Sequence, residues 1–354
     1  MPAPERLLVS GYTESPAGAG PGVRQYSLGS DGTVGKCTAE GSGLRNPSFL
    51  AAGGGAIFAT EEHASGAVVA LDPESLGVLG RVPTGGDDPC HVLHRDGEVW
   101  VANYSSGDAC VTTASAIVGG VDAAALISHP GSGPVADRQG ESHAHQVTAT
   151  PWGTVLVSDL GSDRVDEYVM LDGGPFRVDS AELPPGTGPR HVALKGDFLL
   201  VAGELDGCLH VLRRSALATD ETTQGSGQFW KWLFKTPLAS SVQALEAAEQ
   251  FYPSHLELSA DESKAYAAVR GPNTLVVLDV SGLAGAAPTV PTLLAEVPSG
   301  GNWPRHFALT AEKLYVANQL SDTVSVFALD ADGLPGAEPV QNVDFGSPAC
   351  VLLG

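Results

Sequence analysis

Short apolar runs alternate with polar turns along the whole chain. The clearest runs contain four to seven residues, and 44 Gly and 25 Pro are spread among them. These runs are Ala67–Leu71, Asp166–Met170, Leu209–Leu212, Thr274–Asp279 and Thr323–Leu329. Short runs bounded by turn residues predict many β-strands and few long helices.

A three-residue phrase, usually Pro, a small residue and His, precedes further apolar strands seven times. It begins at Pro47, Pro89, His143, Pro189, Pro253, Pro304 and Pro348. From its third residue to the strand end the distance is 12 residues, as from His91 to Asn103, or 14, as from His145 to Asp159. Because side chains alternate along a strand, a difference of two residues keeps later side chains on the same face. Such self-similarity is typical of a propeller with about four strands per unit.

The two ends of the chain complement each other. The seventh phrase, Pro348–Leu353, supplies only an inner strand, whereas Leu7–Tyr12 and Val23–Leu28 resemble the second and third strands of a unit that lacks its first. A blade shared between the ends closes the ring and removes exposed edge strands. We therefore predict an all-β fold over residues 1–354, a single seven-bladed β-propeller of four-stranded blades.

One long insertion, about residues 215–250, interrupts the rhythm between the fourth and fifth blades. It contains the aromatic segment Phe229–Phe234. Such a segment fits either a lid over a site or packing on the rim of its own blade, and rim packing is the commoner arrangement.

The residue just past each strand end is unusually polar. These residues are Tyr12, Glu62, Tyr104, Leu160, Glu204, Arg270 and Gln319. Equivalent positions of the blades form a ring around the channel of a propeller, so we expect Glu62, Glu204 and Arg270 to meet although they are far apart in sequence. Glu62, Tyr104 and Gln319 are candidate substrate-binding residues.

The phrase itself has informative exceptions. Its middle residue is small in five units but is Arg190 or Arg305 in the other two, and its first residue is His143 in the third unit. The recurrent third-position His is best explained as an imidazole that ties neighbouring blades together, with His145 set apart because His143 stands beside it. Arg305 joins the candidate substrate-binding residues.

These residue types suit the opening of a lactone by water. That reaction needs a base for the water and cationic or N–H donors where the carbonyl oxygen gains charge. His143 or His145, with Glu204, supplies the base. Arg190 and Arg270 supply charge stabilisation or bind a substrate carboxylate or phosphate.

Composition limits which partners and which cellular location we expect. The formal net charge of −22 argues against nucleic acid or an anionic membrane surface, so an anionic substrate needs a local Arg cluster. No apolar run is long enough for a membrane helix, and the N-terminus lacks the pattern of a signal peptide, so we expect a cytoplasmic protein. The five Cys form no CxxC pair and read as small buried thiols.

We expect no metal and no other cofactor. The alternative is a Ca²⁺-dependent propeller, since Glu62, Asn103, Asp159 and Glu204 are all oxygen donors on the predicted ring. Against it, Arg190 and Arg270 would lie close to the cation, which is unfavourable.

The chain resembles a known family in four segments. They are Pro89–His91 leading to Val101–Gly107, Ser142–Val147 leading to Asp159–Arg164, Gly186–His191 leading to Glu204–Leu205, and Trp303–Phe307. At these residues it is similar to the lactonase family of seven-bladed propellers, which includes bacterial propeller-type 6-phosphogluconolactonases and fungal 3-carboxy-cis,cis-muconate lactonizing enzyme.

The resemblance implies a catalytic set of four positions. They correspond to His143 or His145, Arg190, Glu204 and Arg270 in this chain. It also implies a sugar-acid lactone, 6-phosphogluconolactone by default, as substrate. The chain departs from the family at Glu61 and Val269, where Asn is usual before the ring residue.

Two further interpretations stay open. A muconate-type cycloisomerase would use the same Arg residues to hold carboxylates while a His or Glu moves a proton. A non-catalytic propeller that binds partners on its faces is the other, because fold alone never determines function. We expect a monomer, since a closed ring needs no partner.

Overall fold

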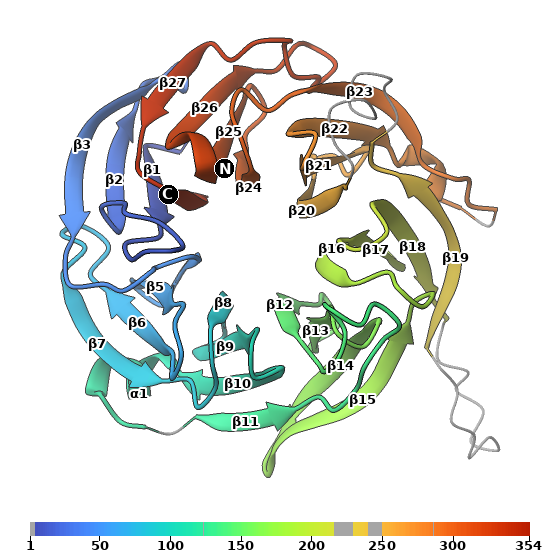
Figure 1. The fold of residues 1–354 in the computed structure, drawn as a ribbon, viewed down its shortest axis with the longest axis horizontal. Coiled ribbons are helices and arrows are strands. Elements are labelled where there is room, and N and C mark those ends of the chain that lie inside the picture. The colour runs from blue at the N-terminus through green and yellow to red at the C-terminus, as the bar shows by residue number, and fades with distance from the viewer. Residues whose placement is uncertain (1–3, 123, 216–228, 240–249, 286) are drawn as a thin grey trace.

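Seven four-stranded antiparallel sheets stand in a ring around a central axis (Figure 1). The computed structural model describes residues 4–122, 124–215, 229–239, 250–285 and 287–354. The predicted all-β, seven-bladed propeller is confirmed, and each blade runs from an inner strand at the axis to an outer strand at the periphery.

Six blades are built from consecutive strands. Blade one contains β4 (Leu50–Gly53), β5 (Ala56–Glu61), β6 (Ala67–Leu71) and β7 (Val78–Pro83). Blade two contains β8 (Pro89–Arg95), β9 (Glu98–Asn103), β10 (Asp108–Thr113) and β11 (Ala125–Ser128). Blade three contains β12 (Ala144–Ala149), β13 (Val155–Asp159), β14 (Arg164–Leu171) and β15 (Gly174–Glu182).

The next three blades follow the same order. Blade four contains β16 (Pro189–Lys195), β17 (Phe198–Gly203), β18 (Cys208–Arg214) and β19 (Trp230–Pro237). Blade five contains β20 (Tyr252–Leu258), β21 (Lys264–Arg270), β22 (Thr274–Asp279) and β23 (Thr292–Pro298). Blade six contains β24 (Pro304–Leu309), β25 (Lys313–Asn318), β26 (Thr323–Ala328) and β27 (Gln341–Asp344).

The seventh blade joins the two ends of the chain, as predicted. Its inner strand is the C-terminal β28 (Pro348–Leu353), followed by β1 (Arg6–Gly11), β2 (Val23–Leu28) and β3 (Val34–Gly41). β1 and β28 pair antiparallel with Val9 opposite Val351. Figure 1 shows the blue and red strands side by side in this blade. The pairing closes the ring with backbone hydrogen bonds.

The repeated phrase lies at or just before the start of each innermost strand. β8, β16, β24 and β28 begin at the proline of the phrase, where the missing N–H removes no ladder hydrogen bond. The register then shifts within the next residues of β8, β12, β16, β20 and β24. A bulge re-aims the side chains beside it. The phrase thereby places the rings of its third residues together at the axis.

The apolar core lies between neighbouring blades. One cluster joins Trp100 and Ala102 of blade two to Val147, Val157 and Tyr168 of blade three, and all five are buried. Similar clusters occupy the other blade junctions. Both faces of each middle strand are buried, which explains the nearly continuous apolar runs in the sequence.

Helices are short. α1 (Ala114–Gly119) is capped by Thr113, whose side chain accepts a hydrogen bond from the Ala116 N–H, and η1 (Ser281–Leu283) and η2 (Gln319–Ser321) are single 3₁₀ turns. Within the described ranges, no helix is long and apolar enough to cross a membrane.

The aromatic segment is part of a blade instead of a lid. Trp230–Pro237 forms β19, the outer strand of blade four, and pairs with β18. Trp230 is buried beside Trp152, and the Arg214 guanidinium lies 4.3 Å from the centre of the Trp152 ring. This arrangement matches packing on the rim. Residues 216–228 and 240–249 of the predicted insertion lie outside the described residues.

Candidate active site

Third-position residues of the phrase fill the axis of the propeller. Their rings form a cluster, here called the axial ring cluster: Phe49, His91, His145, His191, His255 and His306. The His191 ring lies 5.5 Å from the rings of His91 and His145 and 5.1 Å from that of His255. Burial lowers the pKa of all five imidazoles, and that of His255 falls to about 3. These His are therefore neutral packing groups at pH 7.

Glu204, directly after β17, is the centre of a group of three arginines. Its Oε2 lies 2.9 Å from Nε of Arg190 and 2.6 Å from Nη2 of Arg270, and its Oε1 lies 2.6 Å from Nη2 of Arg138. The Glu204, Arg190 and Arg270 side chains are almost completely buried, whereas that of Arg138 is 34% exposed. The predicted meeting of Glu204 with Arg270 is thus observed, with Arg190 as a third member.

The charges of this cluster are strongly coupled. Burial alone would raise the pKa of Glu204, but the charges of Arg270 and Arg190 outweigh it and hold that pKa well below its usual range. Burial, followed by the charge of Arg270, lowers the pKa of Arg190 to about 9. Glu204 is therefore ionised and engaged at pH 7, while the neighbouring guanidiniums repel one another.

Arg190 keeps an unsatisfied donor. One of its Nη groups donates to the Ser254 carbonyl oxygen, but its buried Nε–H, although close to Glu204, is not aimed along a hydrogen bond. Buried donors without an acceptor are unfavourable unless a ligand completes them.

Tyr104 connects this cluster to His143. The phenol oxygen accepts a hydrogen bond of 3.2 Å from Nη2 of Arg138, and the Tyr104 ring stacks on the His143 ring with centroids 4.6 Å apart. His143 Nδ1 lies 2.9 Å from the Tyr104 carbonyl oxygen. A carbonyl only accepts, so Nδ1 carries the hydrogen and Nε2 of the neutral ring has a free lone pair. His143 is half-buried, whereas His145 is buried against Cys90 and the Tyr104 edge.

Glu62, directly after β5, belongs to a second polar cluster. Both its oxygens lie 3.1 Å from the Tyr12 hydroxyl. The Arg305 guanidinium lies 5.1 Å from the centre of the Tyr12 ring and donates to the Gln319 side-chain oxygen over 3.3 Å. Glu62 therefore does not join Glu204 and Arg270 directly. Arg305 links the two clusters electrostatically, because it interacts with the charges of both Glu62 and Glu204.

Arg138 was missed by the sequence comparison. It lies in the long connection between β11 and β12, where no equivalent position exists in the other blades. With Arg138 included, four guanidiniums stand near the carboxylates of Glu204 and Glu62 and the neighbouring Asp88, a local excess of positive charge in a chain of net charge −22.

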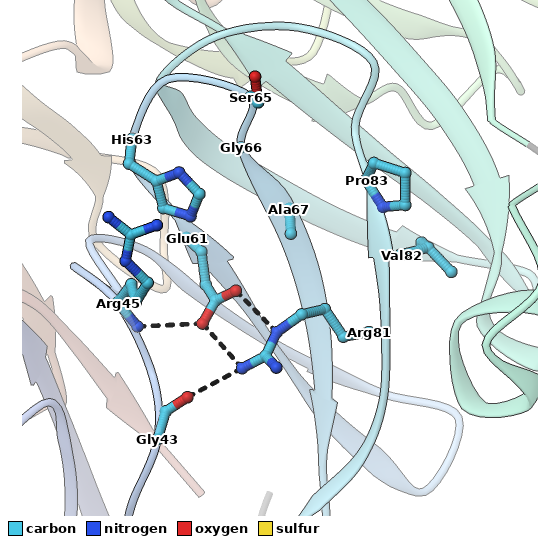
Figure 2. A pocket seen from close by; sticks show the side chains of 10 residues that line it. All are labelled: Gly43, Arg45, Glu61, His63, Ser65, Gly66, Ala67, Arg81, Val82 and Pro83. Atoms are coloured by element: carbon cyan, nitrogen blue, oxygen red, sulfur yellow. Dashed lines mark hydrogen bonds and ion pairs between the residues drawn. The ribbon is translucent and has the colours of Figure 1, made fainter.

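The departure at Glu61 has a structural explanation. Figure 2 shows its carboxylate between Arg81 and the backbone of Arg45, beside His63. Oε2 lies 2.7 Å from Nε of Arg81, and Oε1 accepts from the Arg45 amide and from Nη2 of Arg81, each over 3.0 Å. This pair lines a pocket at blade one, and Glu62 is not among the residues that line it.

The other two predicted oxygen donors, Asn103 and Asp159, form hydrogen bonds with groups close to them in their own blades. The Asn103 amide donates to Asp108, and Asp159 accepts from the backbone amides of His143 and Gly161. Among the described residues, no three His, Cys, Asp or Glu side chains are grouped to hold a metal ion. Leu160, the one apolar member of the ring position, is fully buried.

Known proteins with this fold match nearly the whole chain. A 6-phosphogluconolactonase of Bacillus subtilis is 26% identical over 322 residues, covering 87% of each chain. A periplasmic gluconolactonase of Pseudomonas aeruginosa superposes with a TM-score of 0.80 at 27% identity, and a protein of Lactobacillus plantarum with a TM-score of 0.83 at 26% identity; both cover 98% of each chain. Residues 6–353 match the family described as "Lactonase, 7-bladed beta-propeller". The chain belongs to this lactonase family of seven-bladed β-propellers.

Proposed function

We propose that this protein is a lactonase that opens an anionic sugar-acid lactone with water, 6-phosphogluconolactone being the favoured substrate. The observation that carries the proposal is the surplus of arginine charge at one end of the axis. Repulsion among Arg138, Arg190, Arg270 and Arg305 is relieved when an anion binds. The names of the Bacillus and Pseudomonas relatives support a lactone substrate.

In this proposal the arginines bind the anionic group and stabilise the transition state. Arg190, whose buried Nε–H makes no hydrogen bond, is assigned to the carbonyl oxygen as that atom gains charge. Arg138 is the most exposed arginine around Glu204. It therefore loses the least hydration when it leaves a protein contact to bind the substrate. Glu204 positions the three guanidiniums.

His143 is the base in this proposal. The Tyr104 carbonyl fixes the tautomer, which leaves the Nε2 lone pair to take a proton from an attacking water. His145 is less suitable, since burial and the charge of Arg190 hold its pKa well below its usual value. Glu204 is less suitable because its pKa is also held low and all its oxygens bind arginines.

The test is lactone opening by the purified protein. The product formed from 6-phosphogluconolactone is followed by NMR and compared with the spontaneous reaction, and 3-carboxymuconate is tested in parallel. We expect 6-phosphogluconate to form at least about a hundredfold faster than without protein. Formation of a lactone from 3-carboxymuconate alone would favour a cycloisomerase, and no acceleration of either reaction would overturn the proposal.

His143→Ala is expected to lower kcat by about 10²- to 10⁴-fold, the usual contribution of a general base, with a small change in KM. Added imidazole should restore part of the rate, because a free base can occupy the cavity left by the ring. His94→Ala, which removes a His stacked on Phe58 in the body of the propeller, is the matched control. If kcat were unchanged in His143→Ala, this residue would be excluded as the base.

A further inference from the structure

The lactone reaction needs a second proton transfer besides the one that His143 performs. When water attacks, His143 takes a proton; when the ring C–O bond breaks, the departing oxygen must receive one. An alcohol oxygen is a poor leaving group as an alkoxide, so a positioned acid accelerates this step. Of the carboxyl groups described at this end of the axis, Glu204 is fully bound by arginines.

Glu62 has the surroundings that an acid of this kind needs. It follows β5 at the same position as Glu204 follows β17, so both reach the same end of the axis. As a whole residue, Glu62 is half-buried. The Tyr12 hydroxyl donates to this carboxyl, with both oxygens 3.1 Å away, and fixes its orientation.

The groups that face Glu62 come from several blades. Tyr12 follows β1, Ser48 precedes β4, Asp88 precedes β8 and Arg305 belongs to β24. The buried thiol of Cys90 also lies within range of its charge. Burial raises the pKa of Glu62, and Asp88 adds to this, whereas Arg305, Ser48 and Tyr12 lower it; the net shift is upward.

Glu62 and Glu204 therefore occupy opposite environments at one site. The pKa of Glu204 is lowered by arginines and that of Glu62 is raised by burial. When the pKa values of two nearby carboxyl groups are pushed apart, one is suited to stay ionised and the other to carry a proton. Arg305 interacts with the charges of both carboxyls, so it couples Glu62 to the arginine cluster electrostatically.

We infer that Glu62, held by Tyr12 beside Arg305, is the catalytic acid that protonates the ring oxygen of the lactone. This inference rests on the proposed lactonase function. The hydroxide formed at His143 adds to the carbonyl carbon, and the bond between that carbon and the ring oxygen breaks. The electron pair stays on the ring oxygen, which takes the proton from Glu62. Solvent then returns a proton to Glu62 and removes one from His143, and the product acid ionises.

The first test compares pH profiles of kcat for the wild type and Glu62→Gln. An acid must be protonated, so the wild-type rate should fall as the pH rises through the pKa of Glu62. Glu62→Gln should lose about 10²- to 10⁴-fold in kcat and should lack this alkaline limb. Glu74→Gln, which removes an exposed surface carboxylate, is the matched control and should keep the wild-type profile.

The second test uses Tyr12→Phe, which removes one hydroxyl and preserves the ring. The Tyr12 hydrogen bond lowers the pKa of Glu62, so its loss should move the alkaline limb to higher pH.

The third test uses a carboxylated lactone whose ring oxygen is phenolic. Its leaving group needs no acid, so Glu62→Gln should reduce its turnover by less than about tenfold.

The outcomes separate the two levels of the proposal. If the wild type opens no lactone, the proposed function fails. If the wild type is active and Glu62→Gln retains both its rate within about threefold and the alkaline limb, only the role of Glu62 is overturned. Equal losses on the alkyl and phenolic lactones would also overturn it, because they would indicate a structural role.

Discussion

Glu204→Gln is expected to lower both the stability of the protein and its activity. The change removes the carboxylate that neutralises Arg138, Arg190 and Arg270 and places amide hydrogens against guanidinium hydrogens. Loss of one partner of a buried ion pair typically costs about 3–5 kcal/mol. We expect a loss of this size in the free energy of unfolding, measured by urea denaturation, and a fall in kcat/KM of at least about a hundredfold.

A surface ion pair provides the control for this substitution. Glu40 binds Arg24 over 2.8 Å, but its side chain is 51% exposed, so Glu40→Gln should change the unfolding free energy by less than about 1 kcal/mol. If Glu204→Gln were as stable as Glu40→Gln and fully active, Glu204 would not be required to neutralise or position the arginines.

Acidification is expected to unfold the protein through the axial ring cluster. Its five His have pKa values lowered by burial, so the unfolded chain, with His pKa near 6.5, binds more protons below that pH. The stability that these neutral rings provide is complete above pH 6.5 and is lost as the pH falls. Each His contributes a slope of about 1.4 kcal/mol per pH unit, so five together approach about 7 kcal/mol per pH unit. We expect cooperative unfolding between about pH 6 and 4, followed by circular dichroism.

The repeat itself supplies a control for this effect. Blade one carries Phe49 where blades two to six carry His, and its ring lies 3.9 Å from that of His91. His91→Phe should therefore pack acceptably and reduce the slope by about 1.4 kcal/mol per pH unit. A stability that stays flat from pH 7 to pH 5 in the wild type would contradict the neutral state of the cluster.

The fold could be predicted almost completely from the sequence. The repeated phrase, the conserved parity of its spacing and the complementary ends correctly predicted seven blades and the shared blade. Strands such as β6 and β22 have the predicted bounds, because blade strands are local and buried on both faces. The outer strand β19 was obscured, since it follows residues with no equivalent in the other blades.

The site was predictable only where it follows the repeat. Glu204, Arg190 and Arg270 stood out because their equivalents in other blades differ in charge, and the structure brings them together. Arg138 had no equivalent for comparison, because a connecting loop carries it across to Glu204. Glu62 and Glu204 belong to different clusters because different side chains contact each carboxylate. The position of a residue on the ring does not determine those contacts.

The most direct test of the central claim is the preference of the wild-type protein between two lactones that differ by one anionic group. A surplus of arginine charge should favour 6-phosphogluconolactone over gluconolactone, since each charge-assisted hydrogen bond contributes about 1.5–3 kcal/mol. We predict a ratio of kcat/KM values of at least about tenfold in favour of the phosphorylated lactone, decreasing as salt concentration rises. Equal values for both lactones, or a preference for gluconolactone, would contradict the account.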